Sequence, residues 1–307
     1  MKGYKGFNPG LICKDKQYQE NTVFEEPEAK ICEKGMHFCE SPFDVLDYYD
    51  LIRSDGTPNE FAEVEALDEP KTDDKKKFCS RKLKIGVKLG LSGFVKACVD
   101  FVLEKTIAET PSENVDSGNS AQIGSSGNSA KIGSSGYYAQ IGSSGDYARI
   151  GSSGDYARIG SSGDCAQIGS SGYSTRIGSS GGYAQIGSSG NSTRIGSSGD
   201  YAQIGSSGNS TQIGSSGNST RIGSSGDSTR INCTGSDSVI CCAGHGSVVK
   251  APIGCWITLA EWKYDGAKQR YVPVCVKTEY VDGEKIKADT PYMLKNGEFV
   301  EAKSDGE

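Results

Sequence analysis

The most regular pattern along the chain is an isoleucine at every ninth position from Ile123 to Ile231, thirteen in succession. The repeat reads x-x-Ala/Thr-x-Ile-Gly-Ser-Ser-Gly without insertion, and it breaks down after Ile231, where Asn-Cys-Thr-Gly follows. A short fixed period of this kind is the signature of a solenoid. Residues 119–232 are therefore predicted to form a parallel β-solenoid in a protein that is mainly β.

Each repeat divides its side chains between an inner and an outer face. Side chains alternate across a strand, so Ala148 and Ile150 share one face, and Tyr147 and Arg149 share the other. Nine residues are too few to enclose a core, whereas two repeats form a coil with two short strands and two Gly-Ser-Ser-Gly turns. Glycine is expected to supply the left-handed backbone at those corners. Counted from Ile123, odd and even copies then form two opposite sheets.

The outward positions predict two candidate binding surfaces. Even copies are expected to display tyrosines, and odd copies to display arginines stacked about 4.8 Å apart. Because both residue types are frequent in interface hot spots, the tyrosine face suits a protein partner or self-association, and the arginine face suits an anionic ligand. The alternative is that both are solvated ladders. The candidate binding residues are Tyr147, Tyr183, Tyr201, Arg158, Arg176 and Arg194.

Residues 1–118 are predicted to form a small α+β domain. Ser41-Pro42 marks a helix start, with the helix running through Tyr49. Residues 60–67 and 82–87 alternate polar and apolar, as half-buried strands do. Ser92 can cap a second helix that carries Phe94, Ala97, Cys98, Phe101 and Val102 on one face.

Three residues of this domain are candidates for chemistry. His37 lies between Cys32 and Cys39, a spacing that fits no standard zinc site, so no metal is predicted there. Glu63 and Glu65 lie on the same side of one strand, and paired carboxylates can act as general acid and base. The alternatives are a strand with buried cysteines and a solvated edge strand. No cofactor is predicted.

Residues 233–307 are predicted to contain irregular final coils and a β-meander that caps the rod, because an uncovered terminal coil invites edge-to-edge growth. Strands are expected from Cys255 and over 271–280, with hairpin turns at Asp282-Gly283 and Asn296-Gly297. Cys233, Cys241, Cys242 and His245 have irregular spacing, so packing of small thiols is favoured over metal binding. Calcium is not predicted in the solenoid either, since no carboxylate recurs on both sides of each turn.

Composition excludes several classes of function. The 307 residues carry a net charge of −6, and residues 1–118 hold 17 Lys/Arg against 23 Asp/Glu, so nucleic-acid binding is not expected. No apolar run is long enough to span a membrane. Residues 1–7 lack the apolar region of a signal peptide, and the 11 cysteines follow no framework spacing. Reduced thiols in a cytoplasm are expected.

Both ends of the chain resemble a known family. Gly35-Met36-His37-Phe38-Cys39-Glu40-Ser41-Pro42, followed by Phe61-Ala62-Glu63-Val64, resembles the start of uncharacterised proteins of gut Firmicutes and their phages. Residues 241–247 and 254–262 resemble that family's C-terminal part. The resemblance implies a phage or prophage setting and names no activity. The Gly-x-His-then-helix element is also similar to ADP-ribosyltransferase-like folds, although the substrate-arginine and catalytic-glutamate pattern is missing.

These features favour a non-enzymatic scaffold or interaction protein that uses a rigid solenoid face. In a phage it would be a virion component or an antagonist of host defence, acting in the host cytoplasm. The alternative is an enzyme with a nucleotide-related, ADP-ribosyltransferase-like site in residues 1–118. The solenoid would then be a spacer or an oligomerising arm.

Overall fold

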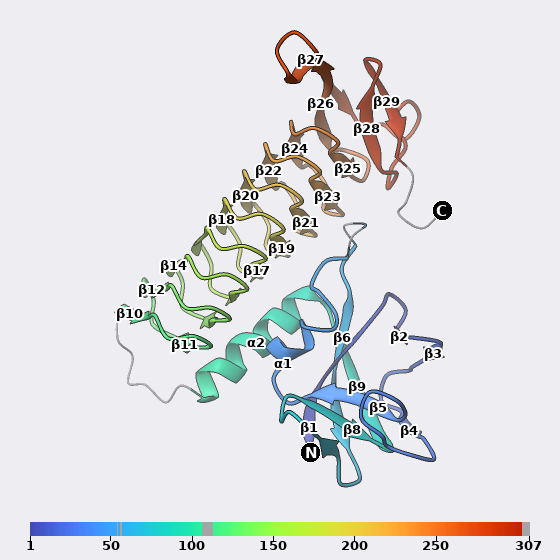
Figure 1. Ribbon diagram of the computed structural model, residues 1–307, viewed down its shortest axis with the longest axis vertical. Coiled ribbons are helices and arrows are strands. Elements are labelled where there is room, and N and C mark those ends of the chain that lie inside the picture. The colour runs from blue at the N-terminus through green and yellow to red at the C-terminus, as the bar shows by residue number, and fades with distance from the viewer. Residues whose placement is uncertain (54, 56, 106–112, 303–307) are drawn as a thin grey trace.

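A computed structural model describes residues 1–53, 55, 57–105 and 113–302. The chain is mainly β, and a straight solenoid rod of about eight turns extends over residues 122–259. The N-terminal α+β domain lies against one side of the rod, with a helix between them (Figure 1). The predicted fold class is thereby confirmed.

Two repeats make one coil of the rod, as predicted. Strands 18 residues apart pair in parallel, so Ile141 lies beside Ile159, and Ile159 beside Ile177. The odd sheet contains β11 (Gln122–Ser125), β13 (Gln140–Ser143), β15 (Arg158–Ser161), β17 (Arg176–Ser179), β19 (Arg194–Ser197), β21 (Gln212–Ser215), β23 (Arg230–Cys233) and β25 (Val248–Lys250). The even sheet contains β10 (Glu113–Asp116), β12 (Lys131–Ser134), β14 (Arg149–Ser152), β16 (Gln167–Ser170), β18 (Gln185–Ser188), β20 (Gln203–Ser206), β22 (Arg221–Ser224), β24 (Val239–Cys242) and β26 (Trp256–Asp265).

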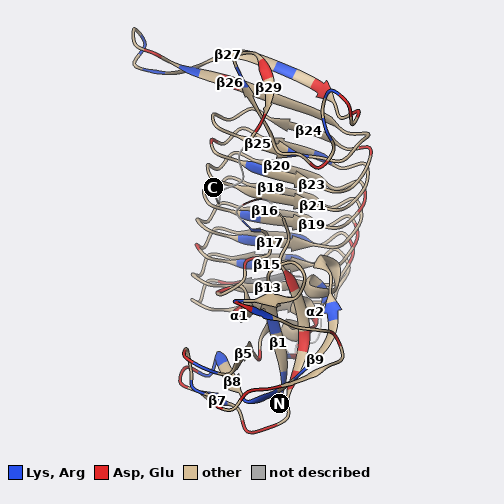
Figure 2. Cartoon of the chain, turned by 90° about the vertical axis from the view of Figure 1, so that its right-hand side faces the viewer, with Lys and Arg blue, Asp and Glu red and all other residues tan. Residues whose placement is uncertain are grey.

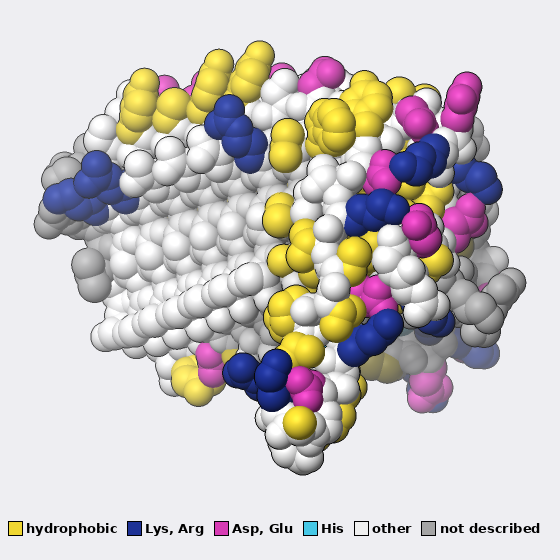
Figure 3. All heavy atoms as spheres, turned by 90° about the horizontal axis from the view of Figure 1, so that it is seen from above, with side chains coloured by type: hydrophobic (Ala, Val, Ile, Leu, Met, Phe, Trp, Pro, Cys, Tyr) yellow, Lys and Arg dark blue, Asp and Glu magenta, His cyan; other side chains and the backbone are white. Residues whose placement is uncertain are grey.

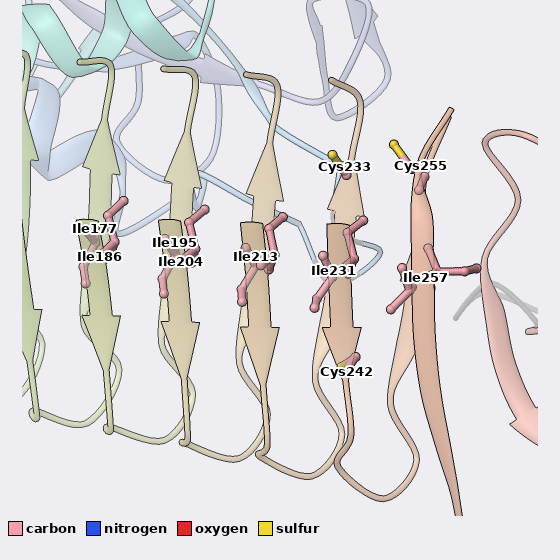
Figure 4. Packing of buried hydrophobic residues seen from close by; sticks show 14 of the residues in the cluster. Ile177, Ile186, Ile195, Ile204, Ile213, Ile231, Cys233, Cys242, Cys255 and Ile257 are labelled. Atoms are coloured by element: carbon pink, nitrogen blue, oxygen red, sulfur yellow. The ribbon is translucent and has the colours of Figure 1, made fainter. Parts of the chain in front are cut away.

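The core of the rod is a stack of isoleucines from both sheets, joined at its C-terminal end by cysteines (Figure 4). Within each four-residue strand the isoleucine and the last residue point inward, while the Arg, Gln or Lys and the glycine point outward. Cys233, Cys242 and Cys255 pack in this core, whereas Cys241 is exposed. All cysteines of the chain are free thiols.

A buried serine ends most of the repeat strands, and its hydrogen bond depends on the next inward residue. Where that residue is threonine, the two hydroxyls pair, as Ser188 Oγ does with Thr193 Oγ1 at 3.1 Å. Where it is alanine, the oxygen of Ser161 and of four other serines is buried without a partner in the described chain, whereas Ser134 Oγ accepts a hydrogen bond from the backbone N–H of Gly136 at 3.4 Å. The Ala/Thr variation in the repeat therefore sets how well the interior polar groups are satisfied.

The turn glycines are required for close stacking, which corrects the expectation that they supply the left-handed corners. The left-handed residue is the second one after each turn glycine, such as Tyr147 with φ 56° and Ser192 with φ 57°. A Cβ on Gly172 would lie 2.1 Å from the carbonyl oxygen of Gly154 in the preceding coil. Only glycine allows the backbones of successive turns to approach so closely.

The residue after each turn glycine is often Asn or Asp, and its side chain links successive coils. Asp146 Oδ1 accepts a hydrogen bond from the backbone N–H of Asp164 at 2.9 Å, and Asn191 Oδ1 accepts one from that of Asn209 at 2.8 Å. Asn and Asp are interchangeable at this position because either side chain can accept this hydrogen bond from the backbone of the next coil.

The N-terminal domain is built on an antiparallel sheet of seven strands in the order β4-β9-β6-β1-β5-β8-β7. Helix α1 is one turn and ends at Val45, earlier than the predicted Tyr49. The elements are β1 (Lys2–Phe7), β2 (Ile12–Cys13), β3 (Lys16–Gln17), β4 (Val23–Glu25), β5 (Met36–Cys39), α1 (Pro42–Val45), β6 (Glu60–Ala66), β7 (Lys71–Thr72), β8 (Lys77–Ser80), β9 (Lys82–Leu89) and α2 (Leu91–Lys105).

Helix α2 is buried on two sides because it lies between the N-terminal sheet and the odd sheet of the rod. Phe94 and Cys98 face the N-terminal core, where the Phe94 ring stacks on Phe61 at 3.7 Å between centroids. Val95 and Val99 are also buried, and they face the rod. A helix that is apolar on both sides is expected between two packed layers, and the single face predicted from sequence described only half of it.

The C-terminal cap closes each sheet with an antiparallel hairpin. In the even sheet β26 pairs with β27 (Arg270–Tyr280), and in the odd sheet β28 (Tyr292–Lys295) pairs with β29 (Glu298–Glu301). Asn296-Gly297 forms the predicted tight hairpin turn, with positive φ at both residues. Asp282-Gly283 lies in the connection between the two sheets, so the hairpin predicted there is wrong. No helix in the described chain is long and apolar enough to cross a membrane.

The close stacking of the turns predicts that alanine substitution has different effects on stability at two glycines of one coil. Gly172→Ala forces a methyl group against the Gly154 carbonyl and should lower the free energy of unfolding by about 3 kcal/mol or more. Gly169→Ala adds a methyl group where no atom lies within 4 Å, and should be neutral or stabilise slightly. Thermal and denaturant unfolding of the two variants tests this, and equal destabilisation would contradict the stacking argument.

Candidate binding surfaces

The arginines predicted to form an open anion-binding face are covered by the N-terminal domain. Arg158 is 3% exposed, and its guanidinium pairs with Asp44, at 3.3 Å from Nη1 to Oδ1, and with Asp47. Arg176 Nε donates to Asp50 Oδ1 at 2.7 Å, and Arg194 Nη2 lies 3.1 Å from Asp50 Oδ2. The prediction of an open arginine face is therefore wrong.

Three aspartates from α1 and the turn after it supply the acidic side of this contact. Burial raises the pKa of Asp44, against the opposing effect of Arg158. Burial also lowers the pKa of Arg194, against the opposing effect of Asp50. Because a buried charge is costly unless it is paired, these ion pairs specify where the domain sits on the rod. The sequence signal was the i, i+3, i+6 spacing of Asp44, Asp47 and Asp50.

Helix α2 packs on the row of outward glycines of the odd sheet. A Cβ on Gly178 would lie 2.6 Å from Val95 Cγ2, and one on Gly196 would lie 3.1 Å from Leu91 Cδ2. Gly142 and Gly160 are in similarly close contact with the helix. The helix approaches the sheet closely because the outward position after each isoleucine has no side chain.

The even sheet has the same glycine row with nothing on it. Ideal Cβ atoms on Gly151, Gly169, Gly187, Gly205 and Gly223 would meet no atom within 4 Å. The row is the floor of a shallow trough. Figure 3 shows a broad face of the rod made of parallel rows of uncharged polar residues and backbone. Figure 2, seen from the side of the N-terminal domain, shows basic residues spaced along the strands of the rod.

One wall of the even-sheet trough is formed by the outward residue at the start of each strand. The exposed wall residues of the repeats are Lys131, Arg149, Gln167, Gln185, Gln203 and Arg221, and the wall continues into the apolar Val239 and Trp256, which are 52% and 49% exposed. The trough thus has a mixed polar wall with an apolar step at its C-terminal end.

The predicted tyrosines lie at the edges of the rod and not on the even sheet face. Tyr147 and Tyr183 are 62% and 58% exposed, but their left-handed backbone places them in the turns that precede the even strands. Tyr183 stacks on Tyr201 with 4.9 Å between ring centroids, and Tyr138 stacks on Tyr156 at the opposite edge. The alternation rule failed here because each strand begins two residues later than assumed.

A second hollow lies in the N-terminal domain beside His37, with a volume of about 740 Å³. Sequence reasoning found His37 and missed its neighbours Lys5, Cys13 and Tyr49, which come from segments far apart in sequence. Lys5 Nζ donates to the His37 carbonyl at 2.8 Å and to Cys13 Sγ at 3.5 Å, and the Tyr49 hydroxyl donates to Cys13 Sγ at 3.1 Å.

The two basic groups of this cavity both have a lowered pKa. Burial lowers the pKa of Lys5, whose ammonium lies 5.4 Å from the centroid of the Tyr18 ring. Burial and the nearby Lys5 and Lys77 lower the pKa of His37 to about 4. The neutral imidazole accepts a hydrogen bond at Nε2 from the backbone N–H of Cys32 at 3.0 Å. Lysine amines and cysteine thiols are both groups that can react with an electrophile, and Lys5 and Cys13 lie side by side here.

Glu63 and Glu65 do not join His37. They line a different hollow, together with Lys2, Lys84 and Lys105. The structure thus does not assemble the three candidate catalytic residues into one site. In the residues that the structure describes, no group of three His, Cys, Asp or Glu side chains is placed to hold a metal ion.

Comparison with known proteins identifies one part of the chain. Residues 1–97 match a family described as a domain of unknown function, DUF7666, which covers the N-terminal sheet, α1 and the first half of α2. No curated protein and no solved structure matches the chain. The match places a family domain beside the rod and assigns no activity to it.

Arg158 and Arg149 occupy equivalent positions on opposite sheets and should respond differently to substitution. Arg158→Gln leaves Asp44 and Asp47 without their partner and should cost about 3–5 kcal/mol of stability. Arg149→Gln on the exposed face should change the free energy of unfolding by less than about 0.5 kcal/mol. Unfolding curves and limited proteolysis of both variants test the difference, and equal stability would show that the ion pairs do not hold the domain.

Proposed function

We propose that the chain is a non-enzymatic interaction or scaffold protein whose rigid rod presents the even sheet to a protein partner. The observation that carries this proposal is the contrast between two sheets of the same repeat. The odd sheet is occupied by the chain's own N-terminal domain, and the even sheet exposes the equivalent glycine row along the rod. The C-terminal ends of both sheets are closed by hairpins, and the even face beside them stays open along the repeats.

The rod is suited to this role because each coil is fixed by its neighbours. Parallel pairing, the stacked turn glycines and the Asn/Asp bonds hold the even face flat over successive coils. A preorganised surface loses little conformational freedom on binding. The resemblance of both ends to proteins of gut Firmicutes and their phages supports a phage setting, with the rod as a virion component or an antagonist of host defence.

A charge placed in the trough should abolish partner binding without unfolding the rod. Gly169→Glu combined with Gly187→Glu puts two carboxylates on the floor of the even face, where there is space for them. Tyr137→Glu combined with Tyr173→Glu is a matched control at an exposed turn edge, where the two rings are 50% and 47% exposed.

Affinity capture from host lysate with quantitative mass spectrometry compares these proteins with wild type. Proteins captured by wild type and by the control should be lost with the even-face variant. If all three capture the same proteins, the even face is not the binding surface.

The cavity beside His37 favours a second candidate function, an enzyme with a nucleotide-related site in the N-terminal domain. It has the volume of a small-molecule site and a buried lysine beside a thiol. The resemblance to ADP-ribosyltransferase-like folds implies a nicotinamide dinucleotide as the ligand to test. The separation of Glu63 and Glu65 from His37 is the main observation against this candidate.

For this second candidate, NAD⁺ should raise the melting temperature of the full chain. A ligand present at a hundred times its dissociation constant stabilises the folded state by about 2.7 kcal/mol. Lys5→Met should remove the effect, whereas Lys84→Met, in the other hollow, should keep it. Differential scanning calorimetry of the three proteins measures it, and no rise with NAD⁺ in the wild type would count against a nucleotide site.

A further inference from the structure

We propose that the trough of the even sheet docks one amphipathic α-helix of a partner protein, aligned with the rod axis. This rests on the proposed function and names the chemistry of the partner. The observation behind it is that the same groove, built by the same repeat on the odd sheet, already holds a helix of this chain. Helix α2 shows which element the glycine row accepts and how closely it fits.

The fit of α2 follows from two matching periods. Successive coils are about 4.8 Å apart, and an α-helix rises about 5.4 Å per turn. One helical turn therefore meets about one coil, and Leu91, Val95 and Val99 face Gly196, Gly178 and Gly160 in turn. The even sheet repeats this glycine spacing from Gly133 to Gly223.

The even trough is long enough for a helix of the same size. Five coil steps separate Gly133 from Gly223, which is about 24 Å at 4.8 Å per step. The 15 residues of α2 extend about 22 Å at 1.5 Å per residue. A docked helix of about four turns would thus cover the repeat part of the even face.

Covering the glycine floor removes water from backbone groups that already have hydrogen-bond partners, so it costs little free energy. The backbone N–H and C=O groups of the even strands already pair with the neighbouring strands. No buried polar group is left unsatisfied when an apolar surface covers them. Because the glycines bring no apolar side chains of their own, the partner has to supply the hydrophobic contact.

The side chains along the walls of the trough determine which residues the partner helix should carry on its sides. On the odd sheet the arginine wall is met by Asp44, Asp47 and Asp50 beside α2. The equivalent wall of the even sheet carries exposed Arg149 and Arg221. The partner helix should therefore present Val, Leu or Ala at i, i+4, i+8 and i+11, with Asp or Glu on one flank.

A peptide copied from α2 is the probe. It comprises residues 88–105 with Leu91, Val95, Val99 and Val102 retained, and carries Phe94→Gln, Cys98→Gln and Phe101→Lys to make the opposite side polar. A lactam between Lys96 and Asp100, an exposed i, i+4 ion pair in the protein, holds it helical. The control peptide carries Val95→Asp and Val99→Asp in addition.

Fluorescence anisotropy measures binding of the labelled peptides to the full-length protein. We expect saturable binding of the probe, and at least a tenfold weaker affinity for the control peptide, for the Gly169→Glu/Gly187→Glu protein and for Gly169→Ala/Gly187→Ala. The alanine variant lifts the helix off the floor without adding charge, so it also covers the case in which the glutamate variant does not fold. The Tyr137→Glu/Tyr173→Glu protein should bind as wild type does.

Three outcomes would overturn the inference. The first is that the probe shows no saturable binding, and the second is that it binds all protein variants equally. The third is that the wild type sediments as a dimer and the even-face variants do not, since the occupant would then be a second copy of the chain. If the probe does not bind while lysate capture still depends on Gly169 and Gly187, the helix is wrong and the proposed function stands. If lysate capture does not depend on the even face either, the inference of a docked helix and the proposed function are both wrong.

Discussion

The structure depends on the close contact between turn glycines of successive coils. Each of these glycines lies so near the carbonyl oxygen of the glycine one coil earlier that a Cβ would come within about 2 Å of it, as at Gly145 against Gly127. This contact sets the coil spacing on both edges of the rod and keeps the strands in register. Because that register is uniform, each sheet has straight rows of one residue type, including the outward glycines.

The outward glycine rows explain how one repeat produces two different surfaces. On the odd sheet the row accepts α2, and the arginines beside it are neutralised by aspartates of the N-terminal domain. On the even sheet the same row is open. The rod therefore carries its N-terminal domain on one face and leaves the glycine row of the other uncovered, and the proposed binding role rests on this contrast.

The cavity beside His37 lies within the N-terminal domain and is separate from the rod surfaces. Its buried lysine and adjoining thiol form a chemically distinctive site, and residues 1–97 form the part of the chain that matches a family domain. A ligand site in this domain and a docking face on the rod are compatible, since different residues build them.

The sequence by itself determined the solenoid, its two-repeat coil and the inward isoleucines, because a period of nine without insertion permits one stacking register. It also determined the Asn296-Gly297 turn, and it singled out His37, which lines a hollow of the N-terminal domain. It could not place the tyrosines, because the strand begins only at Arg149 and the alternation does not extend back to Tyr147. Local sequence does not reveal where a left-handed turn residue falls.

Only the tertiary structure decided which sheet of the rod is covered. Odd and even repeats are nearly identical in sequence, so the difference arises from where the chain leads α2 and from the three aspartates that pair with Arg158, Arg176 and Arg194. The cavity beside His37 was hidden for the same reason, because Lys5, Cys13 and Tyr49 meet only when the strands pair. Repeats fix local geometry, whereas the choice between equivalent faces is made by contacts between residues distant in sequence.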